Sequence, residues 1–188
     1  MAMKGLTFSR ALLLALAVVM ALAPAGPAWA QDDVTWTCPN GLRTVEDPIS
    51  EAPNLACTNL FGANLGRADL AGARLDWSDL RRAHLYRADL SGASLSGADL
   101  RLAEMGRADL TGAMLSAADL SGADLSEANL TDANLYLATL YVANLAGANL
   151  STALGLPTAI LTGARYNPAT KFPPGFDPAG AGMTLVSE

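Results

Sequence analysis

Leucine recurs at every fifth position from Leu55 to Leu150, with Met105 as the one other residue in the series. From Leu65 on, a small residue, usually alanine, stands two positions before each of these, and Asp or Asn often fills the position between. A helix would rotate successive leucines by about 140° around its circumference, and a strand alternates with a period of two, so neither explains a period of five. Such regular repetition indicates a solenoid in which each five-residue unit forms one side of a coil.

The repeated units resemble those of the pentapeptide-repeat family over residues from about 52 to 166. Ala-Asp-Leu-Ser-Gly, Ala-Asn-Leu-Thr-Asp and Ala-Asp-Leu-Arg-Leu all occur in this stretch. The resemblance implies an all-β fold, a right-handed quadrilateral β-helix with four pentapeptides per square coil. It also implies that the leucine and the small residue two before it point inward, while the Asp or Asn between them and the two following residues point outward.

Two segments that do not follow the repeat flank the array, and we expect both to be caps. Residues 31–51 are polar and rich in turn-forming residues, and residues 167–188 are rich in Pro and Gly. Terminal coils need such covers because they otherwise expose core and unpaired backbone. Within the array, Gly155 stands where leucine is due and Leu156 restores the series, which predicts one extra residue, a bulge, around 151–153. Asp177-Pro178 predicts the start of a short helix in the tail.

The first thirty residues have the pattern of a secretory signal peptide. Lys4 and Arg10 precede or flank an apolar run over 11–22, and Ala28-Trp29-Ala30 forms a cleavage site of small residues. The run of about 12 residues is short for a membrane span, which needs about 20. We therefore expect a periplasmic or secreted protein that starts at about Gln31 and is not held in the membrane; the alternative is an uncleaved anchor.

Export changes both the charge and the expected state of the cysteines. Loss of Lys4 and Arg10 takes the formal charge from −6 to −8, which disfavours nucleic acid as a partner. Cys38 and Cys57 are the only cysteines, and an even pair in an exported protein predicts a disulfide, with two free thiols as the alternative. His84 is the only histidine, so we expect no metal site.

Residues twenty apart should stack on successive coils at the sheet spacing of about 4.8 Å, which places charged side chains in rows. One row is Arg67, Arg87 and Arg107, continued by Glu127, with Asp69, Asp89 and Asp109 beside it. We expect each arginine to offset a neighbouring aspartate on a solvated face. The alternative is a stripe that binds phosphate or carboxylate.

A second row contains Asp79, Asp99 and Asp119, with Arg81, Arg82 and Arg101 expected to supply the opposite charge. A calcium ion on these carboxylates is a further alternative. Near the C-terminal end the outward positions become apolar at Tyr136, Leu137, Tyr141 and Val142, which indicates an interface. We expect the chain's own tail, through Met183, Leu185 and Val186, to cover this patch; the alternative is a binding partner.

No arrangement of catalytic residues stands out in the sequence. There is no nucleophile with a base beside it, no Gly-x-Ser-x-Gly and no phosphate-binding loop, so we expect neither enzymatic activity nor a cofactor. The hypothesis is an exported scaffold or binding module that acts by protein–protein interaction in the cell envelope. Its protein partner is unknown, and a homodimer through the tail or the apolar patch is possible. The family resemblance adds one alternative, a DNA mimic that interacts with DNA gyrase, which the export signal and the arginine row disfavour.

Overall fold

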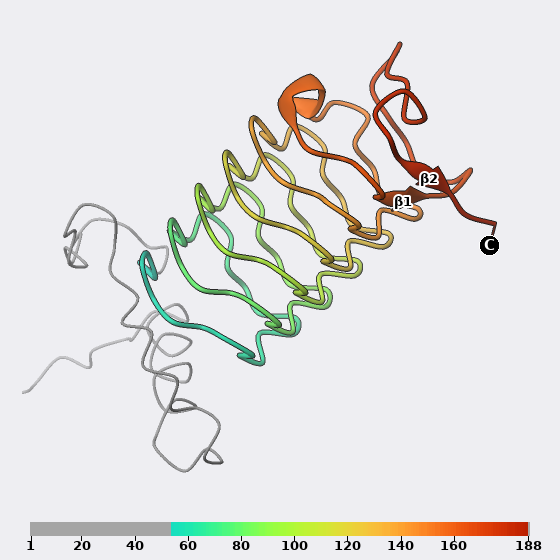
Figure 1. The fold of residues 1–188 in the computed structure, drawn as a ribbon. Helices are drawn as coiled ribbons and strands as arrows, with labels where there is room; N and C mark the ends of the chain where they lie inside the picture. Colours follow the sequence, from blue (N-terminus) through green and yellow to red (C-terminus); the bar gives the residue numbers. More distant parts are fainter. Residues whose placement is uncertain (1–53, 188) are drawn as a thin grey trace, which may run out of the picture.

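The computed structural model describes residues 54–187, which wind into a stack of coils (Figure 1). Parallel bridges join residues twenty apart, beginning with Asn54–Arg74 and Asn59–Asp79 and continuing at every fifth position to Asn134–Leu154. Four five-residue units therefore make one coil, which confirms the predicted right-handed quadrilateral β-helix. The predicted signal peptide, N-terminal cap and Cys38 lie outside the described residues. Within these residues no helix has the length and apolar composition needed to cross a membrane.

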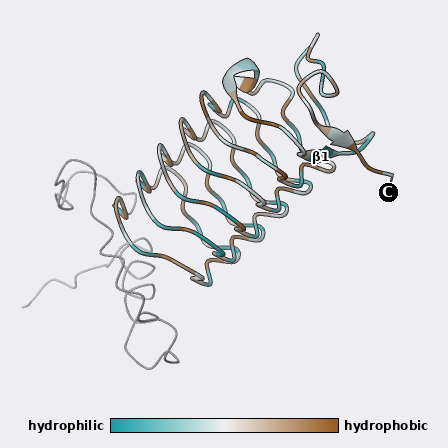
Figure 2. Cartoon of the chain, viewed as in Figure 1, coloured by the Kyte–Doolittle hydropathy of each residue, from teal (hydrophilic) through white to brown (hydrophobic). Residues whose placement is uncertain are grey.

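The leucine series and the alanines two before it fill the interior of the coils. From Leu75 to Leu150 every member of the series, including Met105, has no exposed surface, and the alanines between are at most 1% exposed. Figure 2 shows hydrophobic and hydrophilic segments alternating along each coil. Burial of each leucine side chain contributes about 1.5–3 kcal/mol, and with leucine on every side the centre has room only for small partners.

Each corner of a coil is a tight turn that needs one residue with positive φ. In the turn over residues 80–83, the Ala83 N–H donates to the Leu80 carbonyl at 3.0 Å and Arg82 has a φ of 56°. A positive φ at the third residue defines a type II turn, in which glycine is preferred. Gly62, Gly72, Gly92 and Gly112 hold equivalent corners, but arginine, leucine and tryptophan side chains hold others. The lateral hydrogen bonds of the stack, such as Leu80 N–H to Asp99 carbonyl at 2.7 Å, offset this strain.

The Asp and Asn residues before the leucines have a structural role that the sequence analysis did not assign. The Asp89 carboxylate accepts a hydrogen bond from the Ser91 N–H at 3.0 Å, and the Asn134 side chain accepts one from the Tyr136 N–H at 3.0 Å. A side chain that accepts from the backbone two residues on is an Asx turn, which Asp and Asn favour. Where Asp or Asn occupies this position, its side chain therefore completes the corner.

The break in the repeat differs from the predicted bulge around 151–153. Leu154 still pairs with Asn134, twenty residues before it, whereas Ile160 pairs with Thr139, twenty-one before it. The extra residue therefore lies between them, in the 3₁₀ turn η1, Leu156–Thr158, which has a proline in its first turn. Gly155 enters this turn with φ 80°, and Leu156, only 2% exposed, replaces the absent leucine in the core. The bulge was predicted too early because outward positions carry no signal of register.

The tail closes the C-terminal end of the stack. Strand β1, Arg165–Tyr166, pairs in parallel with β2, Thr184–Leu185, and Lys171 pairs with Asn149. Phe172 lies edge-on to Tyr166 and stacks on Phe176, with ring centroids 5.6 and 5.2 Å apart, and all three rings pack against the core. The predicted boundary at residue 166 stays a prediction.

The helix predicted at Asp177-Pro178 was wrong, because this segment forms turns. The Ala181 N–H donates to the Asp177 carbonyl at 3.1 Å, and the Met183 N–H donates to the Pro178 carbonyl at 3.0 Å. The Pro- and Gly-rich sequence supports these turns without continuing into a helix.

Candidate functional site

The arginine row occupies equivalent corners of successive coils but does not pair with the aspartates beside it. Arg67, Arg87 and Arg107 have φ values of 58–59° and exposed side chains. In the described part of the chain, none of them forms an ion pair with Asp69, Asp89 or Asp109. The expected pairing is wrong: those carboxylates instead accept hydrogen bonds from the backbone N–H groups of residues 71, 91 and 111 at 3.0–3.3 Å.

One member of the row, Arg107, instead makes a contact along the solenoid axis. Arg107 forms a two-pronged ion pair with Glu127, one coil on, in which Nε and an Nη each lie 2.9 Å from a carboxylate oxygen. This contact raises the pKa of Arg107 and lowers the pKa of Glu127 through the shared hydrogen bonds. The Arg87 guanidinium lies 5.3 Å from the centroid of the Tyr86 ring. Arg107 is therefore already engaged, which weakens the interpretation of the row as an anion-binding stripe.

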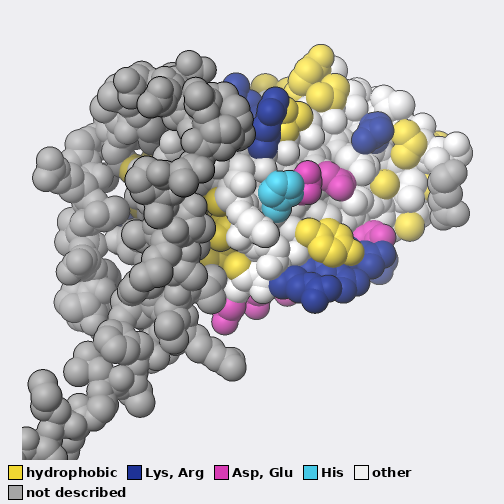
Figure 3. All heavy atoms as spheres, turned by 90° about the horizontal axis from the view of Figure 1, so that it is seen from below, with side chains coloured by type: hydrophobic (Ala, Val, Ile, Leu, Met, Phe, Trp, Pro, Cys, Tyr) yellow, Lys and Arg dark blue, Asp and Glu magenta, His cyan; other side chains and the backbone are white. Residues whose placement is uncertain are grey.

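A hollow on the same face brings together residues that the sequence analysis did not connect. Asn64, Arg67, His84, Tyr86 and Glu104 line it, and His84 Nδ1 lies 2.7 Å from a Glu104 oxygen. Figure 3 shows the histidine beside an acidic side chain, with basic side chains gathered further along the surface. Both members of the pair are more than half exposed, so their attraction is largely screened by water. The twenty-residue spacing of His84 and Glu104 could have predicted the contact.

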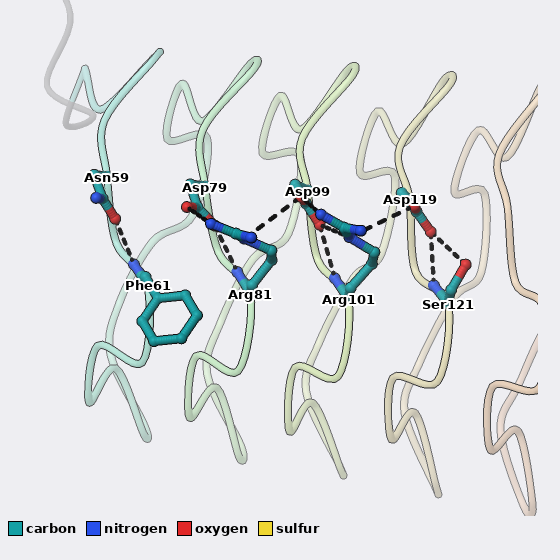
Figure 4. A network of polar contacts seen from close by, with 8 residues as sticks. All are labelled: Asn59, Phe61, Asp79, Arg81, Asp99, Arg101, Asp119 and Ser121. Carbon is teal, nitrogen blue, oxygen red and sulfur yellow. Dashed lines mark hydrogen bonds and ion pairs between the residues drawn. The ribbon is translucent and has the colours of Figure 1, made fainter. Parts of the chain in front are cut away.

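The second row of aspartates forms a polar network with arginines that runs over successive coils (Figure 4). Arg81 donates to both oxygens of Asp79 on its own coil, at 2.8 and 2.7 Å, and lies 3.6 Å from Asp99 on the next. Arg101 repeats this arrangement, at 2.8 and 2.6 Å from Asp99 and 3.8 Å from Asp119. The expectation that Arg81 and Arg101 supply the opposite charge is confirmed.

The aspartates that bind these two arginines are buried. Asp79 and Asp99 are only 2% and 7% exposed, although the resemblance implies an outward side chain at this position. Hydrogen bonds to these carboxylates raise the pKa of Arg81 and of Arg101. Arg82 lies at an exposed corner and forms no ion pair with a described residue, so its expected part in the network is wrong. Since guanidinium groups already neutralise the two buried carboxylates, the network does not favour calcium.

The apolar patch is exposed, and the chain's own tail does not cover it. Tyr136, Leu137, Tyr141 and Val142 are 52%, 56%, 50% and 45% exposed. The tail packs on the end of the stack instead: Met183 is buried in the core, and Leu185 points into solvent with 60% of its surface exposed. The expected intramolecular cover is therefore wrong, because β2 follows the ladder of β1 along the axis.

Two further apolar side chains extend the same end of the solenoid. Leu154 and Ile160, 59% and 52% exposed, occupy the outward bridge positions above Asn134 and Thr139, where Asp or Asn usually stands. Sequence analysis missed both, although an apolar residue directly before a core position is a readable signal. They extend the apolar patch of Tyr136, Leu137, Tyr141 and Val142.

The fold and these surfaces define a class of protein, a solenoid built of stacked five-residue units that presents side chains in rows. Segments spanning 58–97, 78–116, 88–126 and 118–154 match the pentapeptide repeats family, in eight copies. The matched segments together cover more than half of the chain, and the chain therefore belongs to the pentapeptide repeat family.

The solved structure of HetL agrees with the family assignment. HetL, a pentapeptide repeat protein involved in heterocyst differentiation regulation from the cyanobacterium Nostoc sp. strain PCC 7120, is 38% identical over 65% of this chain, with a TM-score of 0.57. A pentapeptide repeat protein from the Arabidopsis thaliana thylakoid lumen is 31% identical over 53% of this chain and 66% of its own, with a TM-score of 0.41.

QnrB1, a plasmid-mediated fluoroquinolone resistance protein, is 20% identical over 71% of this chain and 77% of its own, with a TM-score of 0.41. The match to HetL spans 54% of that protein's length, so this chain aligns with about half of it. No curated protein matches the chain.

Proposed function

We propose that this protein is a non-enzymatic, exported binding module that recognises another protein through the apolar patch. The observation that carries the proposal is the exposure of Tyr136, Leu137, Tyr141 and Val142 beside a tail that packs elsewhere. Contiguous exposed apolar side chains are typical of protein interfaces, and tyrosine is enriched among residues that dominate binding energy. The rigid coils support this role because they hold the patch in one shape before binding, which lowers its entropic cost.

The site of export and the identity of the partner belong to the same proposal. The signal sequence favours a partner in the periplasm or outside the cell, and the first test is the mass of the protein recovered from that fraction. We expect a chain that begins at about Gln31. Recovery of the full-length chain from the cytoplasm would contradict export without affecting the patch.

Crosslinking from single positions tests the patch itself. A photoreactive phenylalanine analogue placed at Tyr136 or Tyr141 should yield one discrete crosslinked product in cells. The matched control is Tyr86, another aromatic residue at a corner position with 43% exposure, on the face of the arginine row. A product of twice the protein's mass would identify a second copy as the partner. Equal products from all three positions, or none from any, would contradict a role for the patch.

DNA mimicry receives no comparable support. The likeness to QnrB1 concerns the fold alone, and two acidic residues of the described coils, Asp79 and Asp99, are already engaged by arginines. We therefore do not propose gyrase as a partner.

A further inference from the structure

The aspartate–arginine network ends in an incomplete unit, directly beside the apolar patch. On three successive coils the network contains Asp79 with Arg81, Asp99 with Arg101, and Asp119 with Ser121 (Figure 4). Ser121 therefore stands where the two preceding coils carry arginine. Three carboxylates face two guanidinium groups, so the network keeps one negative charge, at its C-terminal end.

The contacts of the Asp119 carboxylate show what the missing guanidinium would supply. One oxygen accepts hydrogen bonds from the Ser121 N–H and hydroxyl. The other lies 3.8 Å from Arg101 Nε, beyond hydrogen-bond reach, whereas the corresponding oxygens of Asp79 and Asp99 accept from an arginine Nη at 2.7 and 2.6 Å. The Asp119 side chain is 42% exposed, against 3% and 10% for the other two. It is thus reachable from solvent and has one oxygen without a close donor among the described residues.

The residue one coil above Ser121 is Tyr141, half exposed and part of the apolar patch. Successive coils are about 4.8 Å apart, so Tyr141 lies one coil spacing from Ser121, within the reach of an aromatic side chain. An aromatic ring and a guanidinium already meet across one coil in this column, since the Arg81 guanidinium lies 5.3 Å from the Phe61 ring centroid. A cation over Ser121 would meet both a carboxylate and an aromatic ring, two groups that attract it.

We propose that the Asp119–Ser121–Tyr141 site binds an arginine side chain of the partner, whose neighbouring apolar residues pack on the apolar patch. The inference rests on the proposed function and names its partner chemistry: a protein segment that carries arginine between apolar residues. Arginine fits better than lysine because its planar fork reproduces the two-pronged contacts that Arg81 and Arg101 make with Asp79 and Asp99. The partner's guanidinium lies beside Asp119 as Arg81 lies beside Asp79 and Arg101 beside Asp99.

Two short peptides test the proposal on the whole purified, isotope-labelled protein. The probes are acetyl-Leu-Arg-Leu-amide and its citrulline counterpart, which has nearly the same shape but no charge. We expect the arginine peptide to shift the amide NMR signals of Asp119, Ser121 and Tyr141 and to bind about tenfold more tightly than the citrulline peptide, the scale of a charge-assisted hydrogen bond with a cation–π contact.

Three variants sharpen the test. Asp119→Asn keeps the turn-capping oxygen and should remove the tenfold preference. Ser121→Arg should fold, as the coils with Arg81 and Arg101 do, and should block the arginine peptide with its own side chain. Asp69→Asn, an exposed turn-capping carboxylate outside this column, should change nothing.

The outcomes separate this inference from the proposed function. Equal binding of both peptides at Tyr136 and Tyr141 would overturn the arginine site and leave apolar docking in place. Arginine binding that survives both Asp119→Asn and Ser121→Arg would also overturn it. If neither peptide binds, the arginine site is rejected, while the crosslinking test still decides whether the patch meets a partner.

Discussion

At the scale of single residues, glycine matters most where another backbone comes close. Gly155 has a φ of 80°, and an added Cβ would lie 2.4 Å from the backbone nitrogen of Tyr136 and 2.6 Å from its Cα. Gly92 has a similar φ of 64°, but an added Cβ would meet nothing within 4 Å. Both positions carry the strain of a positive φ, but only Gly155 lacks room for an added Cβ.

Gly155→Ala should therefore destabilise the protein much more than Gly92→Ala. We expect a loss of about 1 kcal/mol for Gly92→Ala, from the left-handed conformation alone, and a further loss of about 1–3 kcal/mol for Gly155→Ala, because a backbone cannot move aside as a side chain can. Urea unfolding of both variants measures the difference. Equal midpoints would show that η1 adjusts without cost.

The Arg107–Glu127 contact gives a residue-scale prediction with a definite sign. Arg107 lowers the pKa of Glu127 in the folded protein below its ordinary value of 4.5. The contact therefore stabilises the fold fully above about pH 4.5, and this stabilisation is lost as the pH falls through the lowered pKa. In a carboxyl NMR titration, Arg107→Ala should raise the pKa of Glu127 towards 4.5. An unchanged pKa would mean that the pair does not form in solution.

At the scale of one coil, position within the five-residue unit decides the cost of a substitution. Leu100 and Leu102 lie two residues apart on the same coil, yet Leu100 has no exposed surface and Leu102 is 52% exposed. Identical side chains in one local sequence thus have opposite environments, which makes them a matched pair.

Leu100→Ala should lose about 2–5 kcal/mol, since it removes buried apolar surface and leaves a cavity that neighbouring coils cannot fill. Leu102→Ala should stay within about 0.5 kcal/mol of the parent, as for other exposed positions. Thermal and urea unfolding compare the two variants. Similar losses would contradict the assigned register of the coil.

The ion-pair column makes a second prediction at this scale. Arg101→Ala removes both short donors to Asp99, a carboxylate that is 7% exposed, and should cost about 1–3 kcal/mol. Arg107→Ala, which breaks a pair whose two side chains are about half exposed, should have a small effect by comparison. Urea unfolding at neutral pH checks the order. A smaller loss for Arg101→Ala would show that water replaces the guanidinium at Asp99.

At the scale of the whole molecule, the coils form one continuous ladder whose two ends need protection. The tail supplies it at the C-terminal end through β2 and the rings of Phe172 and Phe176. At the other end, Cys57 occupies a corner with φ 56° on the first described coil, and its predicted disulfide to Cys38 would tie the preceding segment to this coil.

Cys57→Ser tests that disulfide. A closed loop of about 20 residues is worth about 3 kcal/mol in the chain-entropy model, so the exported variant should unfold at lower urea concentration. Reduction of the parent should produce a similar loss and should not affect the variant. The mass of the alkylated protein without reductant provides a direct check, because two free thiols would add two alkyl groups and contradict the prediction.

The sequence by itself determined the fold, because the leucine series fixes which side chains are buried and a period of five suits only a coil with a turn at each side. It also placed residues twenty apart in rows, since a constant repeat length stacks equivalent positions.

Only the tertiary structure decided which groups within those rows meet. Arg107 pairs along the axis with Glu127 and not with the neighbouring aspartates, which accept hydrogen bonds from the backbone. Arg81 donates to Asp79 on its own coil. The tail continues the ladder and leaves Tyr141 exposed. The physical reason is that repetition fixes the path of the backbone, whereas the rotamers of long side chains and the route of a non-repetitive tail depend on competition among several nearby partners.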